Sequence, residues 1–334
     1  MVPFLFIALF AAAPPFEESF RAGLMALQAN DLKAAEVNLE AAASAKPENG
    51  RVWIALAQTL RKLHLDAKAE EAANRAARFG ASDAPVMQSL AIYYAESGAS
   101  LKSADALAKY AALNPKDSAA RDRAEALYFE AAQALLRQEK FADAIGVLEP
   151  GAANLPGSAQ LRLALGVAYY GLRRFDDAAR AFLATIAISP ETEQPYLFLG
   201  RFLDQIPDRL PVVTKEFVAY EAAHPSSYAG YFLHARALDA QAQDPDGAAK
   251  LLDRAIALND RDAAVHFEFG TVLDRLQRYA EAAREFGKAA SLDPNDPAAH
   301  YRLARDYDRL GKHEEAEEER RLHAGLTQKQ DAVR

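Results

Sequence analysis

Apolar positions spaced three to four residues apart mark two short helices between Ala263 and Pro294. The positions that share one face are Phe269, Gly270 and Leu273 in the first helix, and Ala282, Phe286 and Ala289 in the second. A turn around Gln277 and Arg278 separates the two helices. Short isolated helices are only marginally stable in water. The pattern therefore predicts that this pair buries its apolar faces against other pairs of the same kind.

The same pattern recurs in steps of 34 to 35 residues along the chain. The corresponding positions in the three preceding steps include Tyr231, Ala235, Leu238, Ala248 and Leu252, then Tyr196, Leu199, Gly200, Leu203 and Phe217, then Leu165, Gly166, Tyr169, Ala178 and Phe182. One step forward, Leu303, Ala304, Tyr307 and Gly311 repeat the first half. Because each unit is a helical hairpin, the recurrence predicts an all-α chain of stacked hairpins.

These positions resemble the tetratricopeptide repeat, whose signature is W-x2-L-G-x2-Y, then A-x3-F, then P. The single tryptophan, Trp53, falls in the slot where that family has tryptophan, and Leu56, Ala57 and Leu60 follow it. The resemblance covers nearly the whole chain after residue 15 and implies an α-solenoid, a right-handed superhelix of about nine repeats over 16–326. The expected repeats are about 16–49, 50–83, 84–117, 125–158, 159–192, 193–227, 228–262, 263–296 and 297–330, with 327–334 as a polar tail.

The spacing slips once, between the third and fourth repeats. Pro156 lies 41 residues after Pro115, so seven residues, 118–124, are extra, and they contain neither proline nor glycine. Seven residues are two helical turns, about 10 Å of helix. The sequence predicts one long helix from about Ser118 to Arg137, and the alternative is a short hinge at 118–124.

Two further repeats depart from the pattern. In the sixth, Pro207 and Pro211 interrupt the turn, so its second helix is expected to start at or after Leu210. In the last, Arg320 and His323 replace the apolar residues of earlier second helices. A polar outer face is typical of the terminal helix of a repeat array. We expect this helix to run from about Glu314 to Leu326 and the residues after it to be frayed.

Composition excludes several classes of function. The formal net charge of the 334-residue chain is −8, which disfavours a nucleic-acid partner because such partners select a basic surface. The chain has no cysteine, so disulfides and thiolate metal sites are excluded. No nucleotide-binding, nucleophile-elbow or zinc-protease motif occurs. We therefore expect no enzyme activity, no cofactor and no metal, and an enzyme would need a hidden site between repeats.

An apolar run of ten residues, Phe4–Ala13, lies near the N-terminus and is too short to span a bilayer as a helix. It resembles the core of a secretory signal, although no basic residue precedes it and Pro14 would follow the natural cleavage site. The sequence favours export to the periplasm or medium, with 1–15 as a signal peptide or hydrophobic anchor. The alternatives are membrane association through an uncleaved Phe4–Ala13, or a buried N-terminal helix.

Two histidines share one repeat slot. His266 and His300 lie 34 residues apart, so they could lie on neighbouring helices and bind a metal. The same slot holds Trp53, Tyr128, Tyr196 and Tyr231 in other repeats, and no further ligand has suitable spacing. The sequence therefore favours a half-buried structural role for both histidines.

The resemblance implies that ligands bind along the concave face, at the second, fifth, ninth, twelfth and thirteenth residues of each repeat. In repeats one to five these slots are mainly apolar and include Ile92, Phe129, Leu163 and Tyr170. In repeats six to nine they hold Arg201, Asp204, Arg236, Asp239, Asp274, Arg275, Arg305, Asp308 and Arg309, with Phe232, Phe267 and Tyr301 beside them. Arg and Asp three residues apart on one helix are expected to pair with each other. The matching ninth slots hold no asparagine, so the clamp of the chaperone-tail-binding members is not supported.

Two hypotheses of function remain open. The first is a non-catalytic scaffold that holds a peptide or protein segment along the concave face, where guanidinium groups in series would bind carbonyls or carboxylates. The second is a membrane-tethered structural component of a bacterial-type envelope assembly. For the first, the peptide-binding residues are predicted to be Phe129, Tyr170, Arg201, Asp204, Phe232, Arg236, Asp239, Phe267, Asp274, Arg275, Tyr301, Arg305, Asp308 and Arg309.

Overall fold

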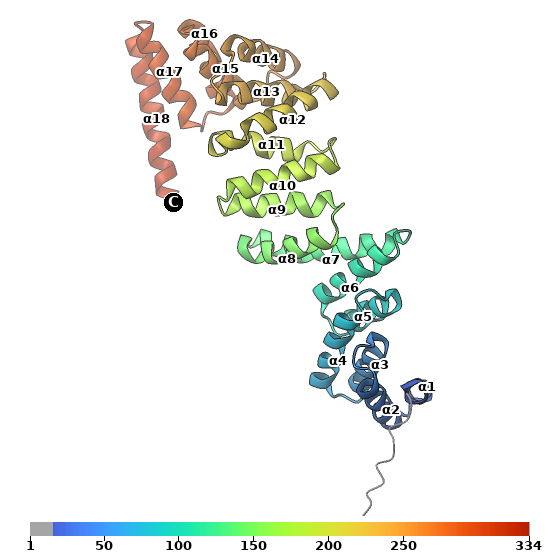
Figure 1. The fold of residues 1–334 in the computed structure, drawn as a ribbon. Helices are drawn as coiled ribbons and strands as arrows, with labels where there is room; N and C mark the ends of the chain where they lie inside the picture. The colour runs from blue at the N-terminus through green and yellow to red at the C-terminus, as the bar shows by residue number, and fades with distance from the viewer. Residues whose placement is uncertain (1–15, 334) are drawn as a thin grey trace, which may run out of the picture. The chain divides into compact units, whose positions relative to one another are not determined.

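The structure is a computed structural model that describes residues 16–333, with side chains to residue 331. The expected N-terminal segment 1–15, including Phe4–Ala13, lies outside the described residues. Residues 16–333 form eighteen α-helices and no strand, which confirms the all-α α-solenoid fold (Figure 1). Within this part of the chain, no helix combines the length and the apolar character needed to cross a bilayer.

The helices alternate as the first and second helix of successive hairpins. The first four hairpins are α1 (Phe16–Gln28) with α2 (Leu32–Ala45), α3 (Gly50–Lys62) with α4 (Asp66–Phe79), α5 (Ala84–Glu96) with α6 (Ser100–Leu113), and α7 (Ser118–Arg137) with α8 (Phe141–Asn154). The next are α9 (Ala159–Gly171) with α10 (Phe175–Ile188), and α11 (Gln194–Gly200), followed by two 3-10 turns (Leu203–Gln205 and Pro207–Arg209), with α12 (Leu210–Ala223). The last are α13 (Tyr228–Ala240) with α14 (Pro245–Leu258), α15 (Ala263–Arg275) with α16 (Tyr279–Leu292), and α17 (Pro297–Arg309) with α18 (His313–Val333).

The chain divides after Ala168 into two compact units, which we call the N-terminal unit and the C-terminal unit. In each, the first helix of a hairpin contacts its own second helix and the second helix of the preceding hairpin, as in the pairs α2–α3 and α14–α15. First helices of successive hairpins also touch each other, as α3–α5 and α13–α15 do. Each helix thus buries its apolar side against neighbouring repeats, as the hydrophobic pattern predicts.

The turn inside each hairpin has the same backbone geometry. Eight of these turns in the described chain have a residue with positive φ at the equivalent position, namely Asn30, His64, Gly98, Glu139, Arg173, Ala242, Gln277 and Gly311. In each of them the next N–H donates to the carbonyl five residues earlier, for example Leu65 to Leu60 at 2.9 Å. This bond closes a Schellman motif, which satisfies a carbonyl at the helix end. Only two of the eight residues are glycine, so the motif forms here without requiring a glycine at the position with positive φ.

In several hairpins the aromatic slot joins the first helix to the loop before it. Trp53 Nε1 donates to the carbonyl of Pro47 at 2.7 Å, and Tyr196 Oη to that of Pro190 at 3.0 Å. The nitrogens of His266 and His300 contact the equivalent carbonyls, of Asp260 at 3.1 Å and Pro294 at 3.4 Å. The repeated bond explains why this slot takes large rings with a polar edge.

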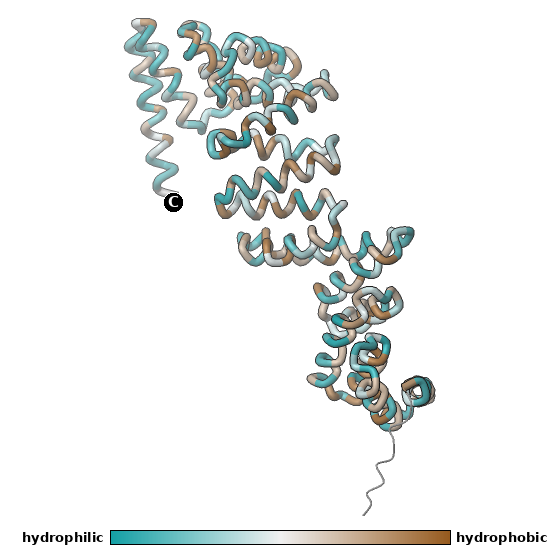
Figure 2. The backbone as a smooth tube through the Cα atoms, viewed as in Figure 1, coloured by the Kyte–Doolittle hydropathy of each residue, from teal (hydrophilic) through white to brown (hydrophobic). Residues whose placement is uncertain are grey.

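The departures from regular spacing have the predicted forms in two places. The twenty-residue α7 spans Ser118–Arg137, so the seven extra residues extend a helix and do not form a hinge. The helix α12 begins at Leu210, after Pro207, and Pro211 lies in its first turn. The prediction for the C-terminal tail was wrong, because α18 continues as helix to Val333. Figure 2 shows that α18 is mainly polar, as expected for a terminal helix.

Candidate functional site

In the C-terminal unit the predicted ligand slots lie along a row of first helices, which we call the inner row. It consists of α11, α13, α15 and α17, and the contacts α11–α13 and α13–α15 join its members. The helix α13 carries Phe232, Arg236 and Asp239; α15 carries Phe267, Asp274 and Arg275; α17 carries Tyr301, Arg305, Asp308 and Arg309. Arg201 and Asp204 follow the end of α11 at Gly200.

Aromatic side chains recur at one slot of the inner row. Phe232 and Phe267 are half-buried, whereas Tyr301 is 47% exposed. An arginine four residues later stands over two of these rings, Arg236 over Phe232 at 5.9 Å and Arg305 over Tyr301 at 5.8 Å. Residues four apart lie on the same helical face, and guanidinium groups are attracted to aromatic faces. The row therefore presents aromatic and cationic groups together.

The expected ion pairs within single helices were wrong. The guanidinium of Arg275 instead binds Asp239 of the preceding repeat, with Nη1 2.7 Å from Oδ1 and 3.0 Å from the backbone carbonyl. Arg309 pairs in the same way with Asp274. The cause is the stacking of the hairpins, which brings each of these arginines against the aspartate of the previous repeat. These four residues form an interhelical ladder that fixes α13, α15 and α17 to each other.

Other predicted residues are also engaged within the fold. Arg236 donates to the carbonyl of Gly200 and lies 3.4 Å from a carboxylate oxygen of Glu268. Asp308 pairs with Arg320 of α18, and His313 lies 3.5 Å away. Asp306, which the sequence did not indicate, is 1% exposed and accepts from Arg309 at 2.9 Å. Arg236, Asp239, Asp274, Arg275 and Arg309 thus hold successive repeats together, and Asp308 joins the two helices of the last hairpin.

Two arginines of the inner row form no ion pair among the described residues. The guanidinium of Arg201 stands 5.3 Å from the ring of Phe198 and is exposed. Arg305 lies over Tyr301 and is half-buried. Of the predicted guanidinium groups, these two are the ones whose hydrogen-bond donors stay available to a ligand.

Burial raises the pKa values of two acidic residues on helices of the inner row, Glu268 and Asp239. Burial raises the pKa of Glu268 above its usual range, although Arg236 opposes the shift, and the nearby Asp239 adds to it. Burial likewise raises the pKa of Asp239, against the attraction of Arg275. Carboxylates removed from water are costly to ionise. These acids therefore oppose folding when they are charged.

Glu268→Gln should consequently show a pH-dependent stability relative to the unmodified protein. Because the folded-state pKa is raised, the folded chain holds a proton that the unfolded chain releases, and stability falls as pH rises from the unfolded to the folded pKa. The glutamine variant cannot ionise, so we expect its relative stability to increase as pH rises through that window. Urea denaturation at several pH values measures the difference.

The matched control is Asp176→Asn on α10 of the same unit. A hydrogen bond from Arg209 lowers the pKa of Asp176, so this carboxylate stabilises the fold above its unfolded pKa and loses that effect as pH falls through the folded one. The asparagine variant should therefore be relatively less stable at neutral pH and approach the unmodified protein in acid. The same pH trend in both variants would contradict the assignment.

The predicted aromatic residues outside the inner row are packed. Tyr170 on α9 belongs to a cluster in the C-terminal unit, with ring centroids 5.5 Å from Phe202 and 5.9 Å from Phe198. Phe129 on α7 is half-buried in the N-terminal unit. Tyr170 therefore serves packing in this structure, and the division between units leaves Phe129 outside the surface described above.

The two histidines of the repeat slot are buried and bonded within their repeats. His266 Nδ1 lies 2.7 Å from Glu285, and His300 Nδ1 lies 2.6 Å from Glu319. Burial lowers the pKa of His266, but the bonds to Glu285 and the Asp260 carbonyl outweigh it and raise the pKa overall. Between residues 16 and 331, no group of three or more acidic or histidine side chains is placed to hold a metal ion.

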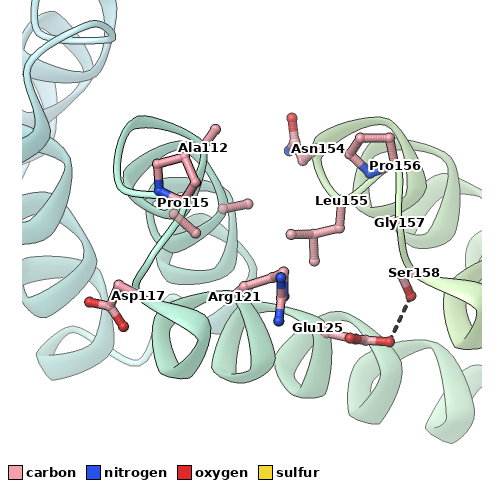
Figure 3. Close-up of a pocket in the computed structure, with 12 residues that line it drawn as sticks. Ala112, Pro115, Asp117, Arg121, Glu125, Asn154, Leu155, Pro156, Gly157 and Ser158 are labelled. Atoms are coloured by element: carbon pink, nitrogen blue, oxygen red, sulfur yellow. Dashed lines mark hydrogen bonds between the residues drawn. The ribbon is translucent and has the colours of Figure 1, made fainter.

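A cleft that sequence reasoning did not predict lies in the N-terminal unit. A cavity of about 340 Å³ lies between the end of α6, the start of α7 and the loop after α8 (Figure 3). Pro115, Leu155 and Pro156 line its walls, and Arg121 and Glu125 of α7 line its floor. The only signal for it in the sequence was the seven-residue insertion.

Comparison with known proteins gives matches to one repeat family. One family model of the tetratricopeptide repeat matches residues 129–192 and 232–297, and a second matches 275–331. No curated protein matches the chain. A solved structure of MamA, from residue 41 to the end, of Desulfovibrio magneticus RS-1 is 20% identical and covers 52% of this chain and 96% of its own, with a TM-score of 0.44. The structure of pilF from Pseudomonas aeruginosa is 17% identical and covers 64% and 99%, with a TM-score of 0.49.

Proposed function

Because this chain belongs to the tetratricopeptide repeat family, we propose that it is a non-catalytic scaffold that binds a segment of a partner protein along the inner row. The contact residues are Tyr301, Arg305 and Arg201, with Phe232 and Phe267 between them. The interhelical ladder of Asp239, Arg275, Asp274 and Arg309 fixes α13, α15 and α17, which carry all of these residues except Arg201. A surface fixed in this way loses little conformational freedom on binding.

The observation that carries this proposal is the exposure of Tyr301 beside Arg305. Tyrosine and arginine are the residue types most often found at the energetic centre of protein interfaces. Tyr301 is 47% exposed, and Arg305 has no carboxylate partner in the described chain. Both groups can therefore meet a ligand without first breaking a bond within the protein.

The test is selection of binding peptides from a displayed library of random sequences. We expect one class of the peptides selected on the unmodified chain to bind the double variant Tyr301→Ala/Arg305→Glu at least about 30-fold more weakly, since hot-spot residues contribute about 2 kcal/mol or more. Arg236 is left intact because its hydrogen bond to the Gly200 carbonyl and its ion pair with Glu268 make it structural.

The control is Arg284→Glu on α16, which also reverses an exposed arginine in this unit. The side chain of Arg284 is 73% exposed and lies outside the inner row, and its ion pair within the described residues is with Glu281, at 3.8 Å. We expect peptide affinity to change by less than about twofold in this variant. Circular dichroism checks that each variant is folded. The proposal is rejected if every selected peptide binds the unmodified chain and the Tyr301/Arg305 variant with equal affinity.

A further inference from the structure

The cleft in the N-terminal unit is a consequence of the inserted residues. Two additional turns at the start of α7 carry Arg121 and place its side chain beneath the ends of α6 and α8. Figure 3 shows Ala112 and Pro115 on one side, Leu155 and Pro156 on the other, and Arg121 and Glu125 along the floor. Its volume of about 340 Å³ is at the lower end of the range of ligand sites, roughly 300–1,000 Å³.

The two charged groups on the floor do not pair with each other. Arg121 and Glu125 are four residues apart on one helix, where opposite charges ordinarily meet. Instead, Arg121 Nε lies 3.4 Å from Asp122, and Glu125 Oε1 accepts from Ser158 Oγ at 2.7 Å (Figure 3). The guanidinium retains further donors and the carboxylate a second oxygen. The floor therefore offers a cationic donor and an anionic acceptor one helical turn apart.

This arrangement of charge selects the kind of ligand. The carboxylates of Glu125 and Asp117 would repel a free anion, and the guanidinium of Arg121 would repel a free cation. A peptide group has a carbonyl oxygen for the guanidinium and an N–H for the carboxylate, and it brings no net charge. The apolar walls formed by Ala112, Pro115, Leu155 and Pro156 suit an aliphatic or aromatic side chain.

We propose that this cleft binds an extended segment of a partner polypeptide, which inserts one apolar side chain between the walls. Its backbone carbonyl accepts from Arg121, and its N–H donates to Glu125. The site lies in the N-terminal unit and uses no residue of the inner row. This proposal can therefore be confirmed or rejected independently of the function proposed above.

The test uses the same displayed library of random peptides on the full chain. We expect a class of selected peptides that binds Arg121→Gln about tenfold more weakly, because a hydrogen bond to a charged group is lost. Ala112→Trp should weaken the same peptides at least about tenfold by filling the cleft. Ala112 is exposed, so the larger side chain does not disturb the core. Hydrogen exchange should show protection at 108–125 and 154–158 on binding.

The matched control is Arg123→Gln, an exposed arginine two residues along the same helix that does not line this cleft. It should change affinity for this class of peptides by less than about twofold, and so should Tyr301→Ala/Arg305→Glu. The proposal is overturned if no selected peptide is weakened by both Arg121→Gln and Ala112→Trp. It is also overturned if alanine replacement of the apolar residue of a sensitive peptide leaves its affinity unchanged.

Discussion

Replacing Phe286 by alanine is expected to lower the free energy of unfolding of the last repeats by about 3–5 kcal/mol. The side chain of Phe286 is completely buried. Its ring stands edge-to-face with Phe267, with centroids 5.5 Å apart, and packs directly on Gly270. Truncation would leave a cavity at the centre of the hairpin α15–α16. Neighbouring helices fill such a cavity only in part, which is why the loss is large.

Urea denaturation followed by two signals measures this effect. Circular dichroism reports on all helices, whereas the fluorescence of Trp53, the only tryptophan, reports on the N-terminal unit. Repeats interact mainly with their neighbours, so we expect an earlier circular dichroism transition and an unchanged Trp53 transition. Phe286→Leu keeps most of the volume and should cost only about 1 kcal/mol. An equal shift of both signals would show that the array unfolds as one body.

Gly50→Ala is expected to destabilise the N-terminal unit by about 1–3 kcal/mol. A Cβ atom at Gly50 would lie 2.6 Å from both the Cα and the N of Gly80, and 3.1 Å from the carbonyl carbon of Phe79. These are backbone atoms at the end of α4, so no side-chain rotation can relieve the contact. The start of α3 must therefore move away from α4. Because Trp53 lies on α3, its fluorescence transition should shift to lower urea.

The control for this prediction is Gly146→Ala on α8. Apart from its two chain neighbours and the nearby backbone of α8 itself, no atom lies within 4 Å of the position that a Cβ would take there. Alanine in a helix interior is more stable than glycine by roughly 0.5–1 kcal/mol, so this variant should gain stability. A gain for Gly50→Ala as well would mean that α3 and α4 do not approach as closely as described.

The structure places most of the predicted ligand slots along one row of helices, but it gives several of their charged residues other partners than the sequence indicated. Periodicity located the slots of Phe232, Phe267 and Tyr301, because corresponding positions of successive repeats lie on the corresponding face of each first helix. It did not reveal that Arg275 pairs with Asp239 of the preceding repeat. Ion pairing depends on distances between side chains of different helices, and a single-helix pattern contains no such distances.

The sequence by itself determined the hairpins, their period and the places where the period breaks. These features follow from local rules: the 3.6-residue helical spacing of apolar positions, the exclusion of proline from helix interiors, and the two-turn length of the insertion at 118–124. Tertiary structure alone decided which charges pair, that α18 continues to Val333, and that the inserted turns border a cleft. The physical reason is that burial, ion pairing and cavity shape depend on how residues from separate repeats meet in space.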